Sequence, residues 1–343
     1  MKRITIKDIS KIAGVSPKTV SRIINNDIYV REETKKKVLE IIEKYDYVPN
    51  IAARSLVINR TNTLGLIVPN LENPFFSRLS RGVIQTAEQN NYSVIVCESR
   101  FDREIGEKYL RMLIERGVDG LLIASLDLDN IFVNKLISIK KPFVLLTCRL
   151  DMPGINYVIA DDCKAGREVV EYLIRLGHKN IAFLKGPDVY SSNERFIAYK
   201  AVMEEHGLKI KDYFITETAL DKKDAYKVTL ELLKEHKDIT AILGHNDYAT
   251  IGIIKAINEL NLKIPKDISV IGYDDIDIAE LLSVPLTTVH YPKYRCGVIA
   301  AQRLISILKK DNIDNIKSKK IILETSFIER NSCGPPKKYL TKL

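Results

Sequence analysis

The stretch that decides the fold opens the chain, where residues 5–25 read TIKDISKIAGVSPKTVSRIIN. Thr5 and Asp8 have the spacing of a capping box, and the isoleucines that follow recur at helical spacing. Gly14 can adopt the left-handed conformation that ends a helix. Ser16 is a good N-cap, so a second short helix is expected directly after the turn.

Two short helices joined by such a turn are typical of a helix-turn-helix, whose second helix lies in the major groove of DNA. Val20, Ile23 and Ile24 give that helix an apolar face. Lys18 and Arg22 can donate hydrogen bonds to guanine. Hydroxyl and amide side chains beside them suit phosphates or bases. An ordinary helical hairpin with a solvated basic face is the alternative.

These residues resemble the lactose-repressor (LacI/GalR) family of transcription regulators. The family pattern T-I-K-D-I-A-x-x-A-G-V-S-x-x-T-V-S-R-x-L-N is matched almost letter for letter, and YVPN at 47–50 and AARSL at 52–56 continue the match. The resemblance extends over most of the chain and implies a sequence-specific DNA-binding regulator. The DNA-contacting residues that it implies are Thr5, Ser16, Pro17, Lys18, Thr19, Ser21, Arg22, Asn25, Ala53 and Leu56.

Two further segments belong to this DNA-binding part. Residues 32–45 predict a third helix with Val38, Leu39, Ile41 and Ile42 on its buried side, and Arg31 stands where the family has a capping Ser or Thr. Residues 49–56 are too short for a stable isolated helix, since helices below about 12–15 residues are marginal in water. By resemblance they form a hinge helix that enters the minor groove, with Leu56 as a wedge that kinks the duplex. A flexible linker is the simpler alternative.

The net charge of +9 is unevenly distributed along the 343 residues. Residues 1–62 hold 13 Lys and Arg against 7 Asp and Glu, whereas residues 63–330 hold 37 of each sign. Residues 331–343 add three lysines and no acid, and are expected to form a basic tail without heptads for tetramerisation. A basic head on a neutral body indicates a polyanionic partner at one end.

Several classes of protein are disfavoured by composition. The five cysteines are scattered without a C-x-x-C pair, which argues against disulfides or zinc and favours a reducing cytosol. No apolar run suits a signal peptide or a membrane span. The histidines lack metal spacing, and nucleotide-binding and nucleophile motifs are absent. We therefore expect a cytoplasmic protein that is not an enzyme and has no metal, no cofactor and no membrane contact.

From residue 64 onward, continuous apolar strands alternate with helical stretches, which indicates buried parallel sheet. The expected strands are 64–68, 93–97, 120–124, 143–147, 180–184, 240–244 and 268–272. They predict an α/β protein with an N-terminal all-α helix-turn-helix head and two doubly wound parallel-sheet subdomains, as in periplasmic binding proteins.

The expected boundaries follow from this pattern. The chain is expected to cross back to the first subdomain near Thr287 to Pro292, and a final strand at 320–328 is expected to close the second. The head spans residues 1–46, and the hinge and linker span 47–62. The effector-binding domain spans 63–330, its first subdomain being 63–160 with 293–319 and its second 161–290 with 320–330.

Open α/β sheets bind ligands beyond the carboxyl ends of their strands, so the residues there are candidates. Several of them match family motifs: NPFF at 73–76, S-x-x-R at 192–195, N-D at 246–247 and G-[FY]-D-D at 272–275. The expected effector-binding residues are Phe75, Phe76, Ser125, Arg149, Asp161, Arg195, Asn246, Asp247 and Asp274.

This set suits a polyhydroxylated ligand such as a sugar. Carboxylate and amide oxygens bind vicinal hydroxyls, and arginine donates to ring and hydroxyl oxygens. A phosphate would want more cations and fewer carboxylates. For any single carboxylate, a salt bridge between the lobes is the alternative, and Asp162 and Asp275 also fit helix N-caps.

The leading hypothesis is a homodimeric repressor of carbohydrate genes that binds a near-palindromic double-stranded DNA operator under the control of a small-molecule effector. A solute-binding protein for a sugar transporter is the alternative, disfavoured by the basic head and the missing signal peptide. A sugar-modifying enzyme is a third hypothesis, disfavoured by the missing catalytic motifs.

Overall fold

The computed structural model describes residues 4–24, 29–47, 60–124, 136–138, 141–217, 221–309 and 318–337. It divides the chain into two compact units, residues 1–61 and residues 62–343. Each unit has buried side chains of its own. Among the described helices, none is long and apolar enough to cross a membrane.

The first unit contains three helices, α1 (Ile6–Ala13), α2 (Pro17–Ile24) and α3 (Glu32–Lys44). The predicted capping box starts α1, because Thr5 Oγ1 accepts from the Asp8 N–H and the Asp8 carboxylate accepts from the Thr5 N–H. Gly14 ends α1 in the left-handed conformation, with φ at 71°. Ser16 caps α2 by accepting from the Thr19 N–H at 3.1 Å. The predicted helix-turn-helix is confirmed.

The three helices enclose a small apolar core of Ile9, Ala13, Val20, Ile23 and Val38. Arg31 precedes α3 without a side-chain capping bond, as its residue type predicts. The expectation for Leu39 is wrong, because α3 turns this side chain outward and leaves it 43% exposed.

Part of the predicted DNA-binding segment cannot be placed in this head. Asn25, at the end of the second predicted helix, lies outside the described residues, and so do Ala53 and Leu56 of the predicted hinge.

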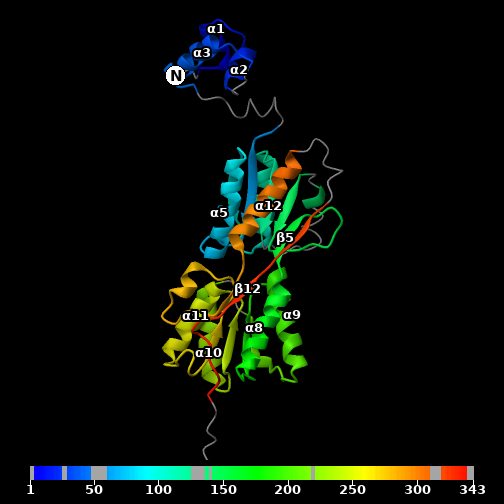
Figure 1. The fold of residues 1–343 in the computed structure, drawn as a ribbon, viewed down its shortest axis with the longest axis vertical. Helices are drawn as coiled ribbons and strands as arrows, with labels where there is room; N and C mark the ends of the chain where they lie inside the picture. The colour runs from blue at the N-terminus through cyan, green and yellow to red at the C-terminus, as the bar shows by residue number, and fades with distance from the viewer. Residues whose placement is uncertain are drawn as a thin grey trace, which may run out of the picture. The chain divides into compact units, whose positions relative to one another are not determined.

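The second unit consists of two α/β lobes (Figure 1). The first lobe has a six-stranded parallel sheet in the order β11-β5-β4-β3-β1-β2. Its strands are β1 (Thr63–Val68), β2 (Ser93–Glu98), β3 (Gly120–Ala124), β4 (Phe143–Leu146), β5 (Tyr157–Ala160) and β11 (Lys320–Leu323).

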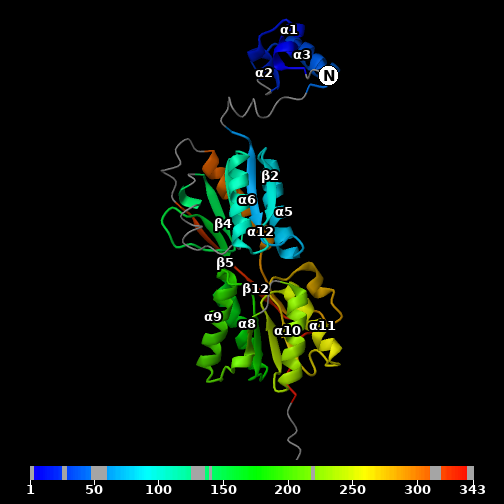
Figure 2. The same ribbon diagram turned by 180° about the vertical axis from the view of Figure 1, so that it is seen from behind.

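Helices cover both faces of this sheet. Helices α5 (Pro74–Gln89) and α12 (Lys293–Leu308) pack side by side on one face, and α6 (Arg103–Glu115) lies on the other (Figures 1 and 2). Leu64 and Leu66 face α5 and α12, whereas Ile67 belongs to the cluster under α6. The near-continuous apolar strands follow from this burial on both sides.

The second lobe has a four-stranded parallel sheet in the order β7-β6-β8-β9. Its strands are β6 (Ile181–Lys185), β7 (Ile215–Glu217), β8 (Ala241–Gly244) and β9 (Ser269–Ile271). Two helix pairs flank them, α8 (Asp162–Arg175) with α9 (Tyr190–Glu205) and α10 (Lys222–Glu235) with α11 (Asp247–Glu259) (Figure 1). Short 3₁₀ helices span Asp212–Phe214 (η1) and Asp277–Glu280 (η2).

The chain passes between the lobes three times. It crosses after β5, after β10 (Thr288–His290), and between β11 and β12 (Ser326–Ile328). β10 and β12 run antiparallel and pair with each other at the crossing, where Figure 1 shows β12 between the lobes. The predicted return to the first lobe near Thr287 to Pro292 is confirmed.

The seven predicted strands are confirmed to within a few residues at their ends, but the expected second-lobe strand at 320–328 is wrong. Residues 320–323 form β11, which extends the edge of the first sheet in parallel register with β5. Glu324 and Thr325 interrupt the strand pattern, and only from Ser326 does the chain pair with β10.

The expected basic tail at 331–343 is also wrong for its first seven residues. Ser332 is fully buried; its carbonyl accepts from the Val270 N–H, and its Oγ donates to the Val270 carbonyl at 2.6 Å. His178 contacts the Gly334 carbonyl at 2.8 Å through Nε2. These bonds satisfy backbone groups along β9, so residues 331–337 belong to the second lobe.

Candidate functional site

The predicted DNA-reading face is on α2. Lys18 and Arg22 are exposed, and Ser16 and Pro17 are exposed at the start of the helix. Thr19 and Ser21 are half-buried beside them, whereas Val20 and Ile23 face the core. The side chain of Thr5 is exposed but serves the capping box of α1.

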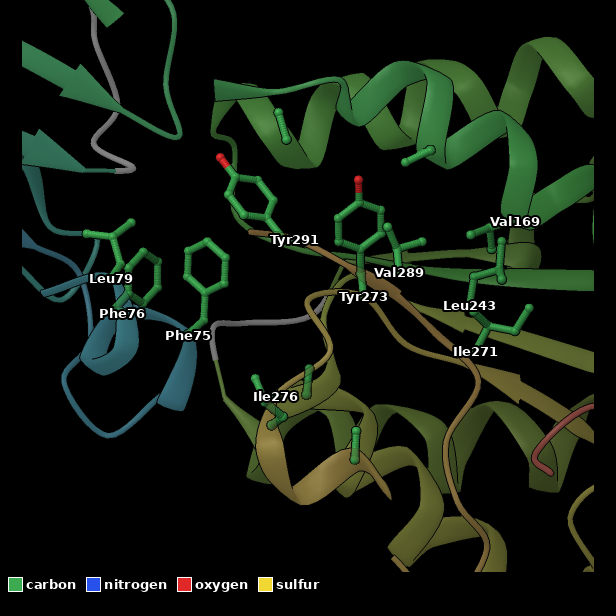
Figure 3. Close-up of a cluster of buried hydrophobic side chains, with 14 of the residues drawn as sticks. Phe75, Phe76, Leu79, Val169, Leu243, Ile271, Tyr273, Ile276, Val289 and Tyr291 are labelled. Atoms are coloured by element: carbon green, nitrogen blue, oxygen red, sulfur yellow. The ribbon is translucent and has the colours of Figure 1, made fainter. Parts of the chain in front are cut away.

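A second candidate site lies in the second unit, in a cavity of about 470 Å³, part of it open to solvent, that both lobes line. We call it the cleft. From the first lobe come Asn73, Phe75, Phe76, Phe101 and Thr147. Phe75 packs edge-to-face on Phe76 and on Tyr291, each at a centroid distance of 5.0 Å, and Figure 3 shows Phe75 facing Tyr291. The first-lobe wall is therefore largely aromatic.

The opposite wall of the cleft is polar. Ser192 and Arg195 come from α9, and His245, Asn246 and Asp274 follow strands β8 and β9. These side chains gather at the carboxyl ends of parallel strands, where α/β proteins bind ligands. Asn246 also caps α11 by accepting from the Ala249 N–H at 2.8 Å.

Arg195 is the most constrained group of this wall. Its Nε and Nη2 lie 2.9 and 2.8 Å from Oδ1 of Asp162, and its Nη1 donates to the His245 carbonyl at 2.6 Å. The guanidinium also stacks on Tyr273, 3.3 Å from the ring centroid. Gly166 allows this packing, because a Cβ there would lie 3.2 Å from the Cα of Arg195.

Burial controls the charges in the cleft. It raises the pKa of Asp274 well above its ordinary value, although Arg195 opposes that shift. It also lowers the pKa of His245 to about 3, and the nearby charge of Arg195 acts in the same direction. His245 is therefore neutral at physiological pH.

Two backbone conformations at the cleft are strained. Thr147, after β4, has φ at 56°, and Asp274, after β9, has φ at 114°. Such values are uncommon for residues other than glycine and cost about 1–3 kcal/mol each. Both residues line the cleft. Strain of this kind concentrates at ligand-binding sites.

The structure brings Phe75, Phe76, Arg195, Asn246 and Asp274 together in the cleft, but not every predicted residue. Arg149 lies outside the described lining and pairs with Asp151 at 2.6 Å. Asp161 serves as N-cap of α8 by accepting from the Lys164 N–H at 3.0 Å. Asp247 is fully buried and bonds to Ile276 N and Thr288 Oγ1. Ser125 lies outside the described residues.

The two acids that also fitted helix N-caps have other roles. Asp162 is the first residue of α8 and pairs with Arg195, while its neighbour Asp161 is the cap. Asp275 pairs with His290 and Arg330 at 2.9 and 2.7 Å.

Some cleft residues were missed by the sequence analysis. Three of them, Asn73, Ser192 and His245, lie within or next to the family motifs, and this position in the sequence could have identified them. Phe101 comes just beyond the second strand, where the strand-end rule applies. Tyr291 lies on a crossover segment, and no sequence signal pointed to it.

Two contacts join the lobes at the rim of the cleft. The Tyr248 hydroxyl donates to Glu72 at 3.3 Å. Tyr190, at the start of α9, packs against the first-lobe cluster and interacts with Arg149. Among the residues that the structure describes, no group of three or more His, Cys, Asp or Glu could hold a metal ion.

Comparisons with known proteins match both parts of the chain to families. Residues 5–50 match the family model of bacterial regulatory proteins, lacI family. Residues 61–330 match the model of periplasmic binding proteins and the sugar binding domain of the LacI family. The HTH-type transcriptional regulator RegA of Clostridium saccharobutylicum is 34% identical over 331 residues, which covers 96% of this chain and 98% of that relative.

Solved structures give the same result. The Lac repressor dimer bound to operator and the anti-inducer ONPF matches with a TM-score of 0.86 at 27% identity, covering 97% of this chain and all of that one. The complex of the transcriptional regulator CelR with cellobiose has a TM-score of 0.72 at 26% identity, covering 96% of this chain and all of that one. The chain therefore belongs to the LacI family of bacterial transcriptional regulators.

Proposed function

We propose that this protein represses carbohydrate genes as a homodimer that reads a near-palindromic operator and responds to a sugar bound in the cleft. The observation that carries the DNA-binding part is the face of α2. Val20 and Ile23 anchor this capped helix in the core, and Lys18 and Arg22 remain exposed opposite them. A helix fixed in this way can present donors to the base edges of the major groove.

The ligand part rests on the two walls of the cleft. Aromatic rings on one side and Arg195, Asn246 and Asp274 on the other suit a sugar, which has apolar faces and hydroxyls around its edge. The related CelR structure contains cellobiose. The strained backbone at Thr147 and Asp274 supports the same assignment.

The dimer is supported by apolar surface on the second lobe. Ile278 in η2 is 44% exposed and Leu281 just after it is 76% exposed, an arrangement that favours burial against another surface. The related Lac repressor structure is a dimer on its operator. A two-fold dimer would place two copies of α2 on the two halves of a palindrome.

The test is selection of DNA from a random pool by the full-length chain, followed by salt-matched affinity measurements. We expect enrichment of a near-palindrome. Arg22→Ala should weaken binding to it by about 1–3 kcal/mol and relax the selected sequence. Lys36→Ala, which removes an exposed charge from α3, is the matched control and should weaken all sequences alike.

Two results would contradict the proposal. The first is the absence of any enriched sequence. The second is equal affinity of wild type and Arg22→Ala for the selected sequence. Sedimentation tests the dimer separately. Leu281→Glu should shift the chain toward monomer, and an unchanged dimer would exclude this surface as the interface.

A further inference from the structure

We propose that Asp162 makes the cleft selective for uncharged ligands, because it neutralises Arg195 and prevents that guanidinium from capturing an anion. The inference rests on the proposed function, since it concerns the ligand of the same cleft. Asp162 is not part of the described lining of the cleft and acts through Arg195. It is therefore a positioning residue and not a ligand contact.

The geometry of the pair shows how Asp162 occupies the arginine. One carboxylate oxygen of Asp162 accepts from both Nε and Nη2, which form one edge of the guanidinium. A carboxylate or phosphate of a ligand would use such an edge for bidentate binding. Nη1 already donates to the His245 carbonyl. These three bonds leave two of the five guanidinium N–H groups of Arg195 for a ligand.

Burial makes this neutralisation effective. Asp162 is 1% exposed and Arg195 is 8% exposed, so water screens the pair weakly. A second acid, Asp274, lies 3.8 Å from Nη2. Within the described lining, the acidic and basic residues are Arg195, His245 and Asp274, and the nearby Lys293 ammonium is bonded to the backbone carbonyls of Asp274 and Asp275.

These charges disfavour an anionic ligand. An entering anion would lose its hydration and meet a guanidinium that Asp162 already compensates. Neutral hydroxyls meet no such penalty, because they can accept from the remaining N–H groups and donate to Asp274. Ser192 offers a further partner, since its hydroxyl is buried and forms no hydrogen bond with the described residues. The ligand class is thus neutral sugars and polyols, and not sugar acids or sugar phosphates.

The direct test measures sulfate binding by calorimetry, because sulfate probes the guanidinium without depending on the shape of a sugar. Asp162→Asn keeps the side-chain shape and removes the charge. We expect the full-length variant to bind sulfate about tenfold more tightly than wild type, or more. Asp161→Asn is the matched control: it removes the same charge one residue away, retains an N-capping side chain and should leave sulfate affinity unchanged.

A double variant separates the cleft from the basic head. The gain in Asp162→Asn should vanish in Asp162→Asn/Arg195→Met. Equal sulfate affinity in wild type and Asp162→Asn overturns the inference, and so does a gain that persists without Arg195. If circular dichroism shows that Asp162→Asn does not fold, Asp162→Ser removes the same charge with a smaller side chain; no gain in sulfate affinity there overturns the inference as well.

Matched sugars distinguish this inference from the proposed function. Thermal shifts of wild type with D-glucose against D-glucuronate, and with D-ribose against ribose 5-phosphate, should appear with neutral members only. An anionic member that binds as tightly as its neutral partner overturns the selectivity, while the proposed function stands if Arg195→Met abolishes that binding. If none of these sugars shifts the melting temperature, sugars are excluded as the effector class. The sulfate comparison then still decides the role of Asp162.

Discussion

Arg195 and Arg149 follow from the same strand-end and motif argument, yet their guanidinium groups lie in opposite environments. Arg195 pairs with Asp162, and the two side chains are 9% and 0% exposed. Arg149 pairs with Asp151 at a similar distance, 2.6 Å, but these side chains are 38% and 53% exposed. Arg330 and Asp275 fall between them, with side chains 16% and 19% exposed.

The N–O distance within an ion pair therefore does not determine how much the pair contributes to the stability of the fold. Water screens the charge of Arg149, so its ion pair with Asp151 adds little to the free energy of unfolding. Removing one partner of a buried pair leaves an uncompensated charge in a poorly polarisable environment, which is costly. The packing of α8 against α9 creates that environment for Arg195. Three substitutions to methionine, which keeps most of the arginine chain length, test this gradient.

The largest effect is expected for Arg195→Met. It leaves Asp162 and Asp274 buried side by side without their shared cation. We expect a loss of about 3–5 kcal/mol in the free energy of unfolding, measured in urea at neutral pH. A loss below about 1 kcal/mol would mean that these acids take up protons when the arginine is removed.

Arg330→Met should have an intermediate effect, about 1–3 kcal/mol, and should change the acid response. Hydrogen bonding from His290, then Arg330, lowers the pKa of Asp275 to about 2 from its ordinary 3.8. The ionised carboxylate therefore stabilises the fold above about pH 4, and this stabilisation, about 2 kcal/mol, is lost as the pH falls to about 2.

The measurement for Arg330→Met is a series of urea transitions between neutral pH and pH 2. The variant should lose less stability than wild type over the acid window, because part of the lowering of the Asp275 pKa is gone. His290→Gln tests the other contributor in the same way. If wild type and both variants lose the same unfolding free energy between about pH 4 and pH 2, Asp275 is not the group responsible for the acid response.

Arg149→Met should have the smallest effect, within about 1 kcal/mol in the same urea assay. Asp151→Asn is its control and should have an equally small effect, because the side chains of Arg149 and Asp151 are 38% and 53% exposed. A loss above about 2 kcal/mol would show that the contact of Arg149 with Tyr190 across the lobes contributes more than its ion pair.

The sequence predicted what depends on local patterns. Capping residues placed α1 and α2, and long apolar runs placed seven strands. The short strand β5 was missed because four apolar residues give too little pattern. The prediction that residues 320–323 belong to the second lobe was wrong. Both sheets are parallel, and the sequence does not show which of them has an edge open to another strand.

The cleft was harder to predict for a reason of helix geometry. Asp161 and Asp162 are adjacent acids, and the sequence predicts the first as a ligand contact. Neighbouring helix residues point about 100° apart, so one caps α8 and the other reaches Arg195. Asp247 follows β8 as the strand-end rule requires, but the bonds that it forms inside the second lobe keep it from the cleft.

We propose that a sugar in the cleft controls DNA binding by the head. The most direct measurement is the affinity of the full-length chain for its selected operator, with and without neutral sugars at millimolar concentration, in wild type and Asp274→Ala. We expect a neutral sugar to change the affinity of wild type about 5–150-fold, and Asp274→Ala to keep the sugar-free affinity and lose the response. A response of the same size in Asp274→Ala, or no response of wild type to any neutral sugar, would contradict it.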